Sequence, residues 1–490
     1  MTPYICEDII RVIIENCVTQ RKKSLHKLLF VNTSWCKITI PLLWKNPWTN
    51  PNSWENLSRT ILLCCDSNSK QFLFSNCDSH FKKILYEKGI IDTQSKFSNH
   101  PLFNYISYIK ILSKDVIESL IEGILVEYYE LNRYNLLQGT FWNLFMNNCN
   151  RLNLNLPNYS ICHFNGTKTC LPSLVKLTCS TFIHHIYFLE LSEICHNLQE
   201  LIINCFQDNK GLAQLIKSQK RLKRIVLKSN NNNILCPLIG DALLTQSNTL
   251  TSINIDYELC IPPEIFNSLV NCEEFAINIP SESDFDFNKL VINLPNLNTL
   301  HSYIYKHQSL PIALNSLSNI ILSSSSSQGN LSHLKIIDLD LYPKYLTTES
   351  INNYLRIISQ CCPYLEFVVV WVRKDILLNL ESFLKKCRFL KEIKFISTEY
   401  TESVENNNIV DVRNIFDILV NNNILPDLSK LTFKENWKFT KENLSEFLES
   451  WSKNKKYPLD YLNIVTSNEL IINVCNRFKK NGILKSCVFD

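Results

Sequence analysis

The stretch that decides the fold is Cys362-Pro-Tyr-Leu365-Glu-Phe-Val368-Val-Val370. Its spacing returns at Cys195/Leu198/Leu201/Ile203 and at Cys387/Leu390/Ile393/Phe395. The final apolar-x-apolar part alternates with period two, which indicates a short strand with one buried face. The apolar residue three positions earlier is also buried in this core, at the turn that leads into the strand. A unit this small cannot bury its apolar face alone, so its copies must stack on one another.

Further copies without a cysteine at the first position extend the pattern from residue 174 to the C-terminus. They are Leu174/Leu177, Leu222/Ile225/Leu227, Leu250/Ile253/Ile255, Leu297/Leu300, Leu334/Ile337/Leu339, Leu428/Leu431/Phe433, Leu459/Leu462/Ile464 and Leu484/Cys487/Phe489, with a degenerate copy at Cys272/Phe275/Ile277. Successive anchors lie 22 to 38 residues apart. Several long steps contain polar runs, which predict surface loops: Asn230–Asn233, Ser323–Ser327, Asn406–Asn408 and Asn421–Asn423. Repeats of this period predict a solenoid.

Apolar residues between the strands follow a helical period. The clearest sets are Ile351/Tyr354/Leu355/Ile358, Leu377/Leu380/Phe383/Leu384 and, after Thr440 as N-cap, Leu444/Phe447/Leu448/Trp451. A helix and a strand in each unit predict an α/β solenoid with irregular repeat lengths. The cysteine-x-x-leucine-x-x-apolar-x-apolar form resembles leucine-rich-repeat proteins, in particular their cysteine-containing subclass. The resemblance covers residues 171–490.

The composition argues against several classes of protein. Fifty Lys and Arg residues stand against 46 Asp and Glu, a net charge of +4, so no nucleic-acid partner is expected. The sequence contains no run of about 18 apolar residues, so no membrane partner is expected. No basic segment leads into an apolar run at the N-terminus, which argues against a signal peptide. We expect a cytoplasmic or nuclear protein, or one found in both compartments.

Twenty cysteines require an explanation. No Cys-x-x-Cys occurs, and no cysteine pair accompanies a histidine pair at zinc-finger spacing. Cys149, Cys195, Cys362 and Cys387 each precede a leucine by three residues. Repetition at one repeat position favours a small buried apolar side chain over the alternatives of a metal ligand or a disulfide.

Residues 1–48 do not follow the repeat pattern. Ile5, Ile9, Ile10, Ile13 and Cys17 predict an amphipathic helix after Pro3, and Leu25, Leu28, Leu29 and Trp35 predict a second. Pro41 is expected at the first turn of a third, with Leu42, Leu43 and Trp44. A unit this small cannot bury so many apolar side chains alone, which implies a partner.

The sequence of this segment resembles an F-box, as found in F-box-like families expanded in fungi. The resemblance rests on Val31-Asn-x-x-Trp35-Cys36 and on Leu43-Trp-x-Asn-Pro-Trp48. It departs from the family pattern at the start, where Leu-Pro and Glu should lie closer together, so the register of the first helix is open. The family implies docking on the Skp adaptor, and through it on the cullin, of a ubiquitin ligase. The implied contact residues are Pro3, Ile9, Ile10, Ile13, Leu28, Val31, Trp35, Pro41, Leu43 and Trp44. On spacing alone, a cap on the N-terminal end of the solenoid is favoured over an interface.

The chain therefore divides into three parts on sequence grounds. Residues 1–48 form the F-box-like helical domain, residues 49–170 contain linker helices and irregular early repeats, and residues 171–490 form the repeat array. In the middle part, Ile106/Ile109/Ile111 and Leu152/Leu154/Leu156 are candidate strands of early repeats.

The sequence offers no catalytic motif. Its eight glycines are never closer than 16 residues, so no glycine-rich phosphate loop or nucleophile elbow can be built from them. No His-x-x-x-His pair occurs. We expect a protein that is not an enzyme and needs no cofactor or metal.

The strand positions that alternate with the buried ones should face outward and bind a target protein. In the middle repeats these are Asp338, Asp340, Phe367, Val369, Trp371 and Lys394. Phe367, Val369 and Trp371 would form an exposed apolar patch of the kind that is enriched in binding hot spots. The alternative is that a neighbouring loop or a C-terminal segment covers them.

The expected function follows from the resemblance. It is that of a substrate-recognition adaptor in a ubiquitin ligase of the Skp–cullin–F-box type, with the repeats binding an unknown target protein. A repeat scaffold that never meets a ligase, and a small-molecule sensor within a ligase, are the alternatives.

Overall fold

The computed structural model describes residues 9–14, 25–49, 51, 53–90, 101–125, 130–230, 234–279, 292–304, 310–325, 333–338, 346–397, 410–420, 425–434, 437–455 and 457–489. The chain forms two compact units. Unit 1 comprises Met1–Asn204 and Asn209–Leu222, and unit 2 comprises Cys205–Asp208 and Lys223–Asp490.

Unit 1 begins with helices and continues into strand–helix repeats. Residues 9–14 are helical. The following elements are α2 (Leu25–Leu28), α3 (Thr33–Trp44), η2 (Pro47–Thr49), α4 (Trp54–Leu63), α5 (Ser67–Ser75), α6 (Ser79–Glu87), η3 (Tyr105–Tyr108), β1 (Ile111–Ser113), α7 (Lys114–Leu125), α8 (Leu131–Asn148), β2 (Asn153–Asn155), α9 (Thr167–Cys170), η4 (Leu171–Ser173), β3 (Lys176–Ser180), α10 (His185–Ile194), β4 (Glu200–Asn204) and α11 (Lys210–Lys217). The strands are parallel and ordered β1-β2-β3-β4. The first two strands lie in the stretch assigned to linker helices and early repeats.

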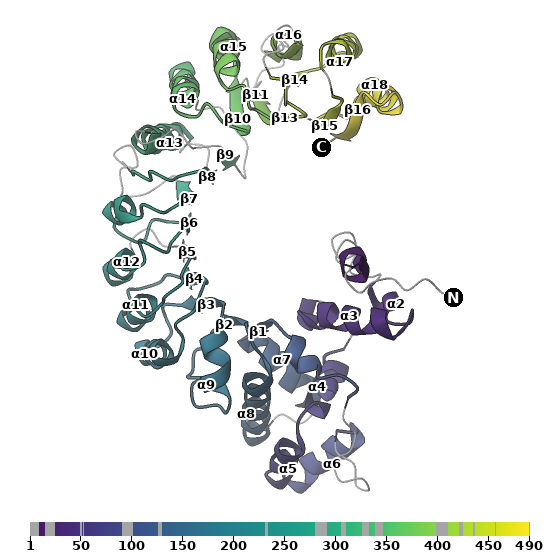
Figure 1. The fold of residues 1–490 in the computed structure, drawn as a ribbon, viewed down its shortest axis with the longest axis vertical. Helices are drawn as coiled ribbons and strands as arrows, with labels where there is room; N and C mark the ends of the chain where they lie inside the picture. Colours follow the sequence, from purple (N-terminus) through teal and green to yellow (C-terminus); the bar gives the residue numbers. More distant parts are fainter. Residues whose placement is uncertain are drawn as a thin grey trace. The chain divides into compact units, whose positions relative to one another are not determined.

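Unit 2 continues the same alternation. Its elements are β5 (Arg224–Ser229), α12 (Pro237–Leu244), β6 (Ser252–Tyr257), η5 (Pro263–Ser268), β7 (Glu274–Ile279), β8 (Thr299–Ile304), α13 (Leu310–Ser325), β9 (His333–Asp338), α14 (Thr348–Cys361), β10 (Phe367–Val372), η9 (Lys374–Ile376), α15 (Leu377–Lys386), β11 (Glu392–Ser397), β12 (Val410–Asp411), α16 (Val412–Val420), β13 (Lys430–Lys434), β14 (Trp437–Lys438), α17 (Lys441–Asn454), β15 (Leu459–Ile464), α18 (Glu469–Lys480) and β16 (Leu484–Phe489). The main sheet runs in chain order, and β12 pairs separately with β14. Within this unit the helices cover one side of the strands (Figure 1).

The register confirms the repeat read from the sequence, except at the copy Leu334/Ile337/Leu339. There Leu334, not Ile337, takes the strand position and pairs with Leu300 of β8. Val368 of β10 pairs with Ile393 of β11, which pairs with Leu431 of β13 and through it with Leu462 of β15. In unit 1, Leu154, Leu177 and Leu201 align in the same way. These side chains are fully buried, and each contributes about 2 kcal/mol by leaving water. The fold is a parallel α/β solenoid.

The cysteines at the repeat position behave as predicted. Cys149, Cys195, Cys362 and Cys387 are buried, and every described cysteine is a free thiol. The Cys387 thiol donates to the carbonyl of Cys362 in the previous repeat at 3.7 Å, and the Cys149 thiol donates to Ile106 at 3.3 Å. Burial raises the pKa of Cys195 and of Cys387 to about 12. The position therefore holds a small apolar side chain, and in Cys149 and Cys387 the thiol is also a weak donor to an earlier segment of the chain.

Two boundary predictions were wrong. Ser323 to Ser325 lie in the last turn of α13 rather than in a loop. Within that turn the Ser323 hydroxyl donates to the Asn319 carbonyl at 2.8 Å, and it also lies within hydrogen-bond distance of the Ile292 carbonyl. The runs 231–233, 326–327, 406–408 and 421–423 fall outside the described residues.

Pro41 does not begin a helix but lies inside α3. The helix begins at Thr33 because the Asn32 side chain accepts a hydrogen bond from the Trp35 amide at 3.0 Å, which is an N-cap. An interior proline lacks one helical hydrogen bond, and α3 tolerates the loss.

Candidate functional sites

The N-terminal helices of unit 1 have a small core of their own. Ile10, Ile14 and Leu25 are buried together. Half-buried side chains pack around this core, namely Leu28, Trp35, Ile38, Leu42 and Leu43. Ile10, Leu28, Trp35 and Leu43, assigned to adaptor contact from the resemblance, therefore support this core. Pro3 lies outside the described residues.

A second apolar face on the same helices is open to solvent. The exposed fractions are 55% for Ile9, 57% for Val12, 40% for Ile13, 88% for Phe30 and 55% for Val31. Ile9 and Ile13 are one helical turn apart, as are Ile10 and Ile14 on the inner face. The segment 9–14 is thus apolar on both sides, and only one side is occupied. We call the exposed set the N-terminal apolar face.

Trp44 and Trp48 anchor the N-terminal helices to the first repeats. The Trp44 ring stacks on Tyr105 at a centroid distance of 4.4 Å, and the Trp48 indole N–H donates to the Ile111 carbonyl at 2.6 Å. Lys110 also donates its backbone N–H to the Lys45 carbonyl at 3.0 Å. The Trp44 ring therefore makes a contact within the chain, and its assignment to the adaptor contact stays a prediction.

The predicted apolar patch on β10 does not exist. Trp371 is only 1% exposed and Val369 is equally buried, while Phe367 is half-buried. Tyr354 of α14 donates its hydroxyl to the Val369 carbonyl at 3.2 Å, and its ring lies 5.8 Å from that of Trp371. Strict alternation fails here: all residues from Val368 to Val372 are buried.

The other predicted target-binding residues do not lie together on one exposed surface that the structure describes. Lys394 is half-buried on β11. Asp338 ends β9, and Asp340 lies outside the described residues. No shared patch with Phe367 is defined by these positions within the part of the chain that the structure describes.

The strand face instead carries ion pairs between neighbouring strands, a feature that sequence reasoning missed. Glu274 of β7 is the centre of one cluster in unit 2: it lies 3.6 Å from Arg224 of β5, accepts a 2.8 Å hydrogen bond from Ser252 of β6, and lies 3.8 Å from His301 of β8. Lys228 and Asp256 pair at 3.0 Å further along strands β5 and β6. The sequence indicates these ion pairs through oppositely charged residues at corresponding positions of neighbouring strands.

These pairs make the strand face polar but nearly neutral. Each exposed pair contributes little stability, about 0–1 kcal/mol. Among the described strand residues the opposite charges of these pairs neutralise one another, which suits a protein surface better than a polyanion. An open face lined by parallel strands is typical of protein-interaction scaffolds.

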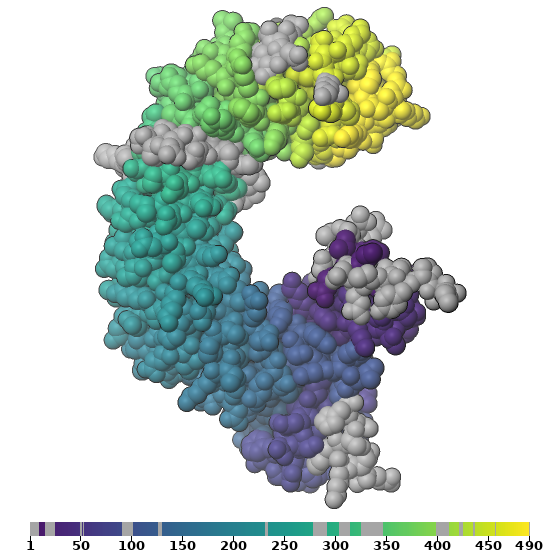
Figure 2. Space-filling model, viewed as in Figure 1, coloured from purple at the N-terminus to yellow at the C-terminus, as the bar shows by residue number. Residues whose placement is uncertain are grey.

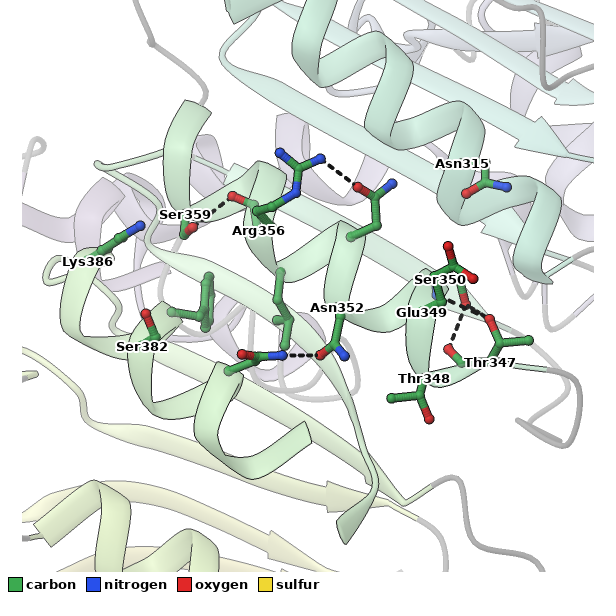
Figure 3. Close-up of a pocket in the computed structure, with 14 residues that line it drawn as sticks. Asn315, Thr347, Thr348, Glu349, Ser350, Asn352, Arg356, Ser359, Ser382 and Lys386 are labelled. Atoms are coloured by element: carbon green, nitrogen blue, oxygen red, sulfur yellow. Dashed lines mark hydrogen bonds between the residues drawn. The ribbon is translucent and has the colours of Figure 1, made fainter. Parts of the chain in front are cut away.

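A polar groove of about 980 Å³ lies over α14 on the helix side of unit 2, between α13 and α15 (Figure 3). At one end Arg356, Ser359, Ser382 and Lys386 gather, and at the other Glu349 lies beside Thr347 and Ser350. Asn379 donates to Asn352 at 2.8 Å between them. Among the described residues, Arg356 and Lys386 have no carboxylate within ion-pair distance, so this end is basic.

The groove contains no catalytic arrangement. Of its fourteen lining residues, Glu349 is the one carboxylate, and none of the fourteen is a histidine or a cysteine. Within the described ranges, no cluster of three or more His, Cys, Asp or Glu side chains could hold a metal. None of the helices seen in those ranges is long and apolar enough to cross a bilayer.

Comparison with known proteins adds little. No protein-family model matches the sequence, and no curated protein matches it. Among solved structures, an internalin from Listeria monocytogenes is similar over 68% of this chain and 92% of its own, with 11% identity and a TM-score of 0.31. A likeness at this level assigns neither a family nor a function.

Proposed function

We propose that this chain is a non-catalytic substrate-recognition subunit of a ubiquitin ligase of the Skp–cullin–F-box type. In this proposal the N-terminal apolar face docks on the Skp adaptor, and the strand-lined repeats bind a target protein. The observation that carries the proposal is the two-faced helix at residues 9–14, which has one apolar side filled and the other open.

The open side is the kind of surface that a partner groove covers. Ile9 and Ile13 are spaced as anchors for helix-in-groove recognition, and Phe30 and Val31 add two exposed apolar side chains after α2. Burying such side chains on association is favourable by about 1.5–3 kcal/mol each before the costs of binding. A role as a solenoid cap accounts for the inner face, Ile10 and Ile14, and for the Trp48 anchor, but leaves the outer face unexplained.

The alternative is a repeat scaffold that engages no ligase. The stacking of Trp44 on Tyr105 favours this alternative. It shows that part of the F-box-like sequence packs the N-terminal helices against the first repeats. The two readings differ in whether the N-terminal apolar face has a partner.

Coexpression with the Skp adaptor followed by size-exclusion chromatography distinguishes the two. We expect one-to-one co-elution of the wild-type chain, and loss of co-elution in the double variant Ile9→Glu/Ile13→Glu. Because both side chains are exposed, the variant should retain the circular dichroism and the unfolding midpoint of the wild type.

The matched control is Leu378→Glu, which changes an exposed leucine on α15 of unit 2 and should leave co-elution intact. Failure of the folded wild-type chain to co-elute, or equal loss in the control, would remove the ligase from the proposal and leave the scaffold.

A further inference from the structure

The polar groove over α14 separates opposite charges along one helix. Glu349 lies in the first turn of α14 and Arg356 lies two turns later, while Lys386 of α15 lines the same end of the groove as Arg356 (Figure 3). All three side chains are exposed. Within the described ranges none of them takes part in an ion pair. The groove therefore has an acidic end and a basic end, and its helices belong to the green part of the surface in Figure 2.

Charges on other helices of unit 2 pair with each other across neighbouring helices. Arg413 of α16 lies 3.2 Å from Glu446 of α17, and Arg477 of α18 lies 3.5 Å from Glu449 of α17. The charges around α14 differ because they lie apart along the groove instead of facing one another. They are therefore open to a ligand that brings the opposite charges in the matching order.

Four amide side chains line the same groove, namely those of Asn315, Asn352, Asn353 and Asn379. Asn379 donates to the Asn352 side-chain oxygen at 2.8 Å, and Arg356 donates to that of Asn353 at 2.8 Å. A carboxamide has two N–H donors and an oxygen with two lone pairs, so these bonds use only part of its capacity. A carboxamide presents the same groups as a peptide bond, so these side chains suit the main chain of an extended peptide.

The lining disfavours ligands that are held by stacking. Phe383 is the one aromatic residue among the fourteen that line the groove, and it is only 1% exposed. A nucleobase needs an accessible ring or guanidinium plane on each site where it stacks, and the groove offers no accessible ring. Amides, hydroxyls and two separated charges favour a peptide instead.

The separation of the charges defines a spacing for such a peptide. Glu349 and Arg356 are seven positions apart in α14, which corresponds to about 10 Å along the helix axis. An extended chain advances roughly 3.3–3.6 Å per residue. Side chains that pair with the two ends should therefore be about three or four residues apart in the ligand.

We propose that this groove binds an extended peptide segment of a partner protein in which a basic and an acidic side chain are three or four residues apart. The basic side chain pairs with Glu349, and the acidic one pairs with Arg356 and Lys386. The main chain between them bonds to Asn352 and Asn379. The groove lies on the helix side of unit 2 rather than on the strand-lined face, so this inference does not depend on the ligase proposal.

The test uses the full chain and a set of short fluorescent peptides with capped ends. Each peptide contains one lysine and one glutamate in a serine and alanine background, from adjacent to seven residues apart. We expect fluorescence anisotropy to show the tightest binding at a separation of three or four. Peptides with the two residues adjacent or seven apart should bind about threefold to fivefold more weakly, because they can form one of the two exposed pairs but not both.

A charge reversal makes the test independent of folding defects. In the double variant Arg356→Glu/Lys386→Glu both ends of the groove are acidic, so a peptide with two lysines at the same spacing should replace the lysine–glutamate peptide as the preferred ligand. A misfolded chain could not acquire this new preference. The matched control is Lys385→Glu, which changes the neighbouring exposed lysine of α15. Lys385 pairs with Glu381 at 2.7 Å and does not line the groove, so the control should keep the wild-type preference.

Three results would overturn the proposal. The first is equal binding at every spacing, which would indicate unspecific attraction. The second is no binding of any peptide by the folded wild-type chain. The third is displacement of the peptide by N-acetylglutamate amide at the concentration at which the peptide itself competes, because the groove would then bind a single anion. The variant Ile9→Glu/Ile13→Glu should bind the peptides like the wild type, which separates this result from that of the adaptor experiment.

Discussion

Trp371 shows what decides the exposure of a side chain on a strand. The alternation rule places it outward, yet the indole lies against Tyr354 of α14. Sequence predicts which positions of a repeat are buried, such as Leu365 and Val368, because the same residue type returns in every copy. It does not predict Trp371, because the contact with Tyr354 occurs in one repeat only.

Replacing Trp371 with alanine tests this placement. Because the ring is fully buried, we expect the substitution to lower the free energy of unfolding by about 3–5 kcal/mol. The measurement is the urea midpoint followed by circular dichroism. Leu378→Ala is the control, and its exposed side chain should change stability by no more than about 0.5 kcal/mol. An unchanged midpoint in the tryptophan variant would show that the indole faces solvent, as the sequence alone suggests.

The hydroxyl of Tyr354 can be tested separately. Tyr354→Phe keeps the ring against Trp371 but leaves the buried Val369 carbonyl without this donor. A buried acceptor without a partner costs about 1–3 kcal/mol. We therefore expect a lower unfolding midpoint with an unchanged far-ultraviolet circular dichroism spectrum, and a midpoint equal to the wild type would contradict the hydrogen bond.

At the scale of elements, close packing between neighbouring helices depends on one glycine. A Cβ atom at Gly211 of α11 would overlap the backbone carbonyl of His185 at the start of α10. Both helices belong to unit 1. A side chain at this position would push the two helices apart, so the repeat spacing there depends on glycine. Nothing in the single sequence distinguishes it from the other seven glycines.

Two alanine substitutions form a matched pair. Gly211→Ala should destabilise unit 1 by about 1–3 kcal/mol, because the added methyl group meets rigid backbone. Gly139→Ala in α8 has open space around the new Cβ and should stabilise by about 0.5–1 kcal/mol through helix propensity. Differential scanning calorimetry of both variants checks the prediction, which fails if the two shifts have the same sign.

The buried cysteines make the repeat elements sensitive to alkali. The pKa values of Cys195, Cys272 and Cys387 are raised to about 12 in the folded chain, in each case mainly by burial. Unfolded thiols ionise near pH 8.5, so folded thiols hold protons that unfolded ones release. Their stabilisation is complete below about pH 8.5 and is lost as the pH rises towards 12.

Each such thiol should lower the free energy of unfolding by about 1.4 kcal/mol per pH unit within that window. Urea unfolding at pH 8 to 11 measures the slope. The double variant Cys195→Ala/Cys387→Ala should have a slope shallower by about 2–3 kcal/mol per pH unit. An identical slope would mean that these two thiols ionise in the folded chain as freely as in the unfolded one.

For the whole molecule, the fold class was predictable because each further copy of the repeat supports the same assignment. One copy of Leu365/Val368/Val370 could be a strand or a piece of a buried helix, but many copies with helical stretches between them leave one interpretation. The N-terminal helices occur once, so their boundaries were predicted less well. Pro41 was taken as the start of a helix, whereas the N-cap is Asn32. The ion pairs around Glu274 depend on register between strands, which spacing alone does not define.

The sequential ladder of unit 2 has a mechanical consequence. Each strand bonds only to the strands before and after it in the order of the main sheet, so tension on the C-terminus loads the β15–β16 row first and leaves the remaining rows unstressed. The strand pairs then separate one after another along the sheet. A repeat of about 25 residues releases roughly 85 Å of chain, and the longer repeats release more. In a single-molecule stretching experiment we therefore expect a low force trace with steps of unequal length rather than one tall rupture.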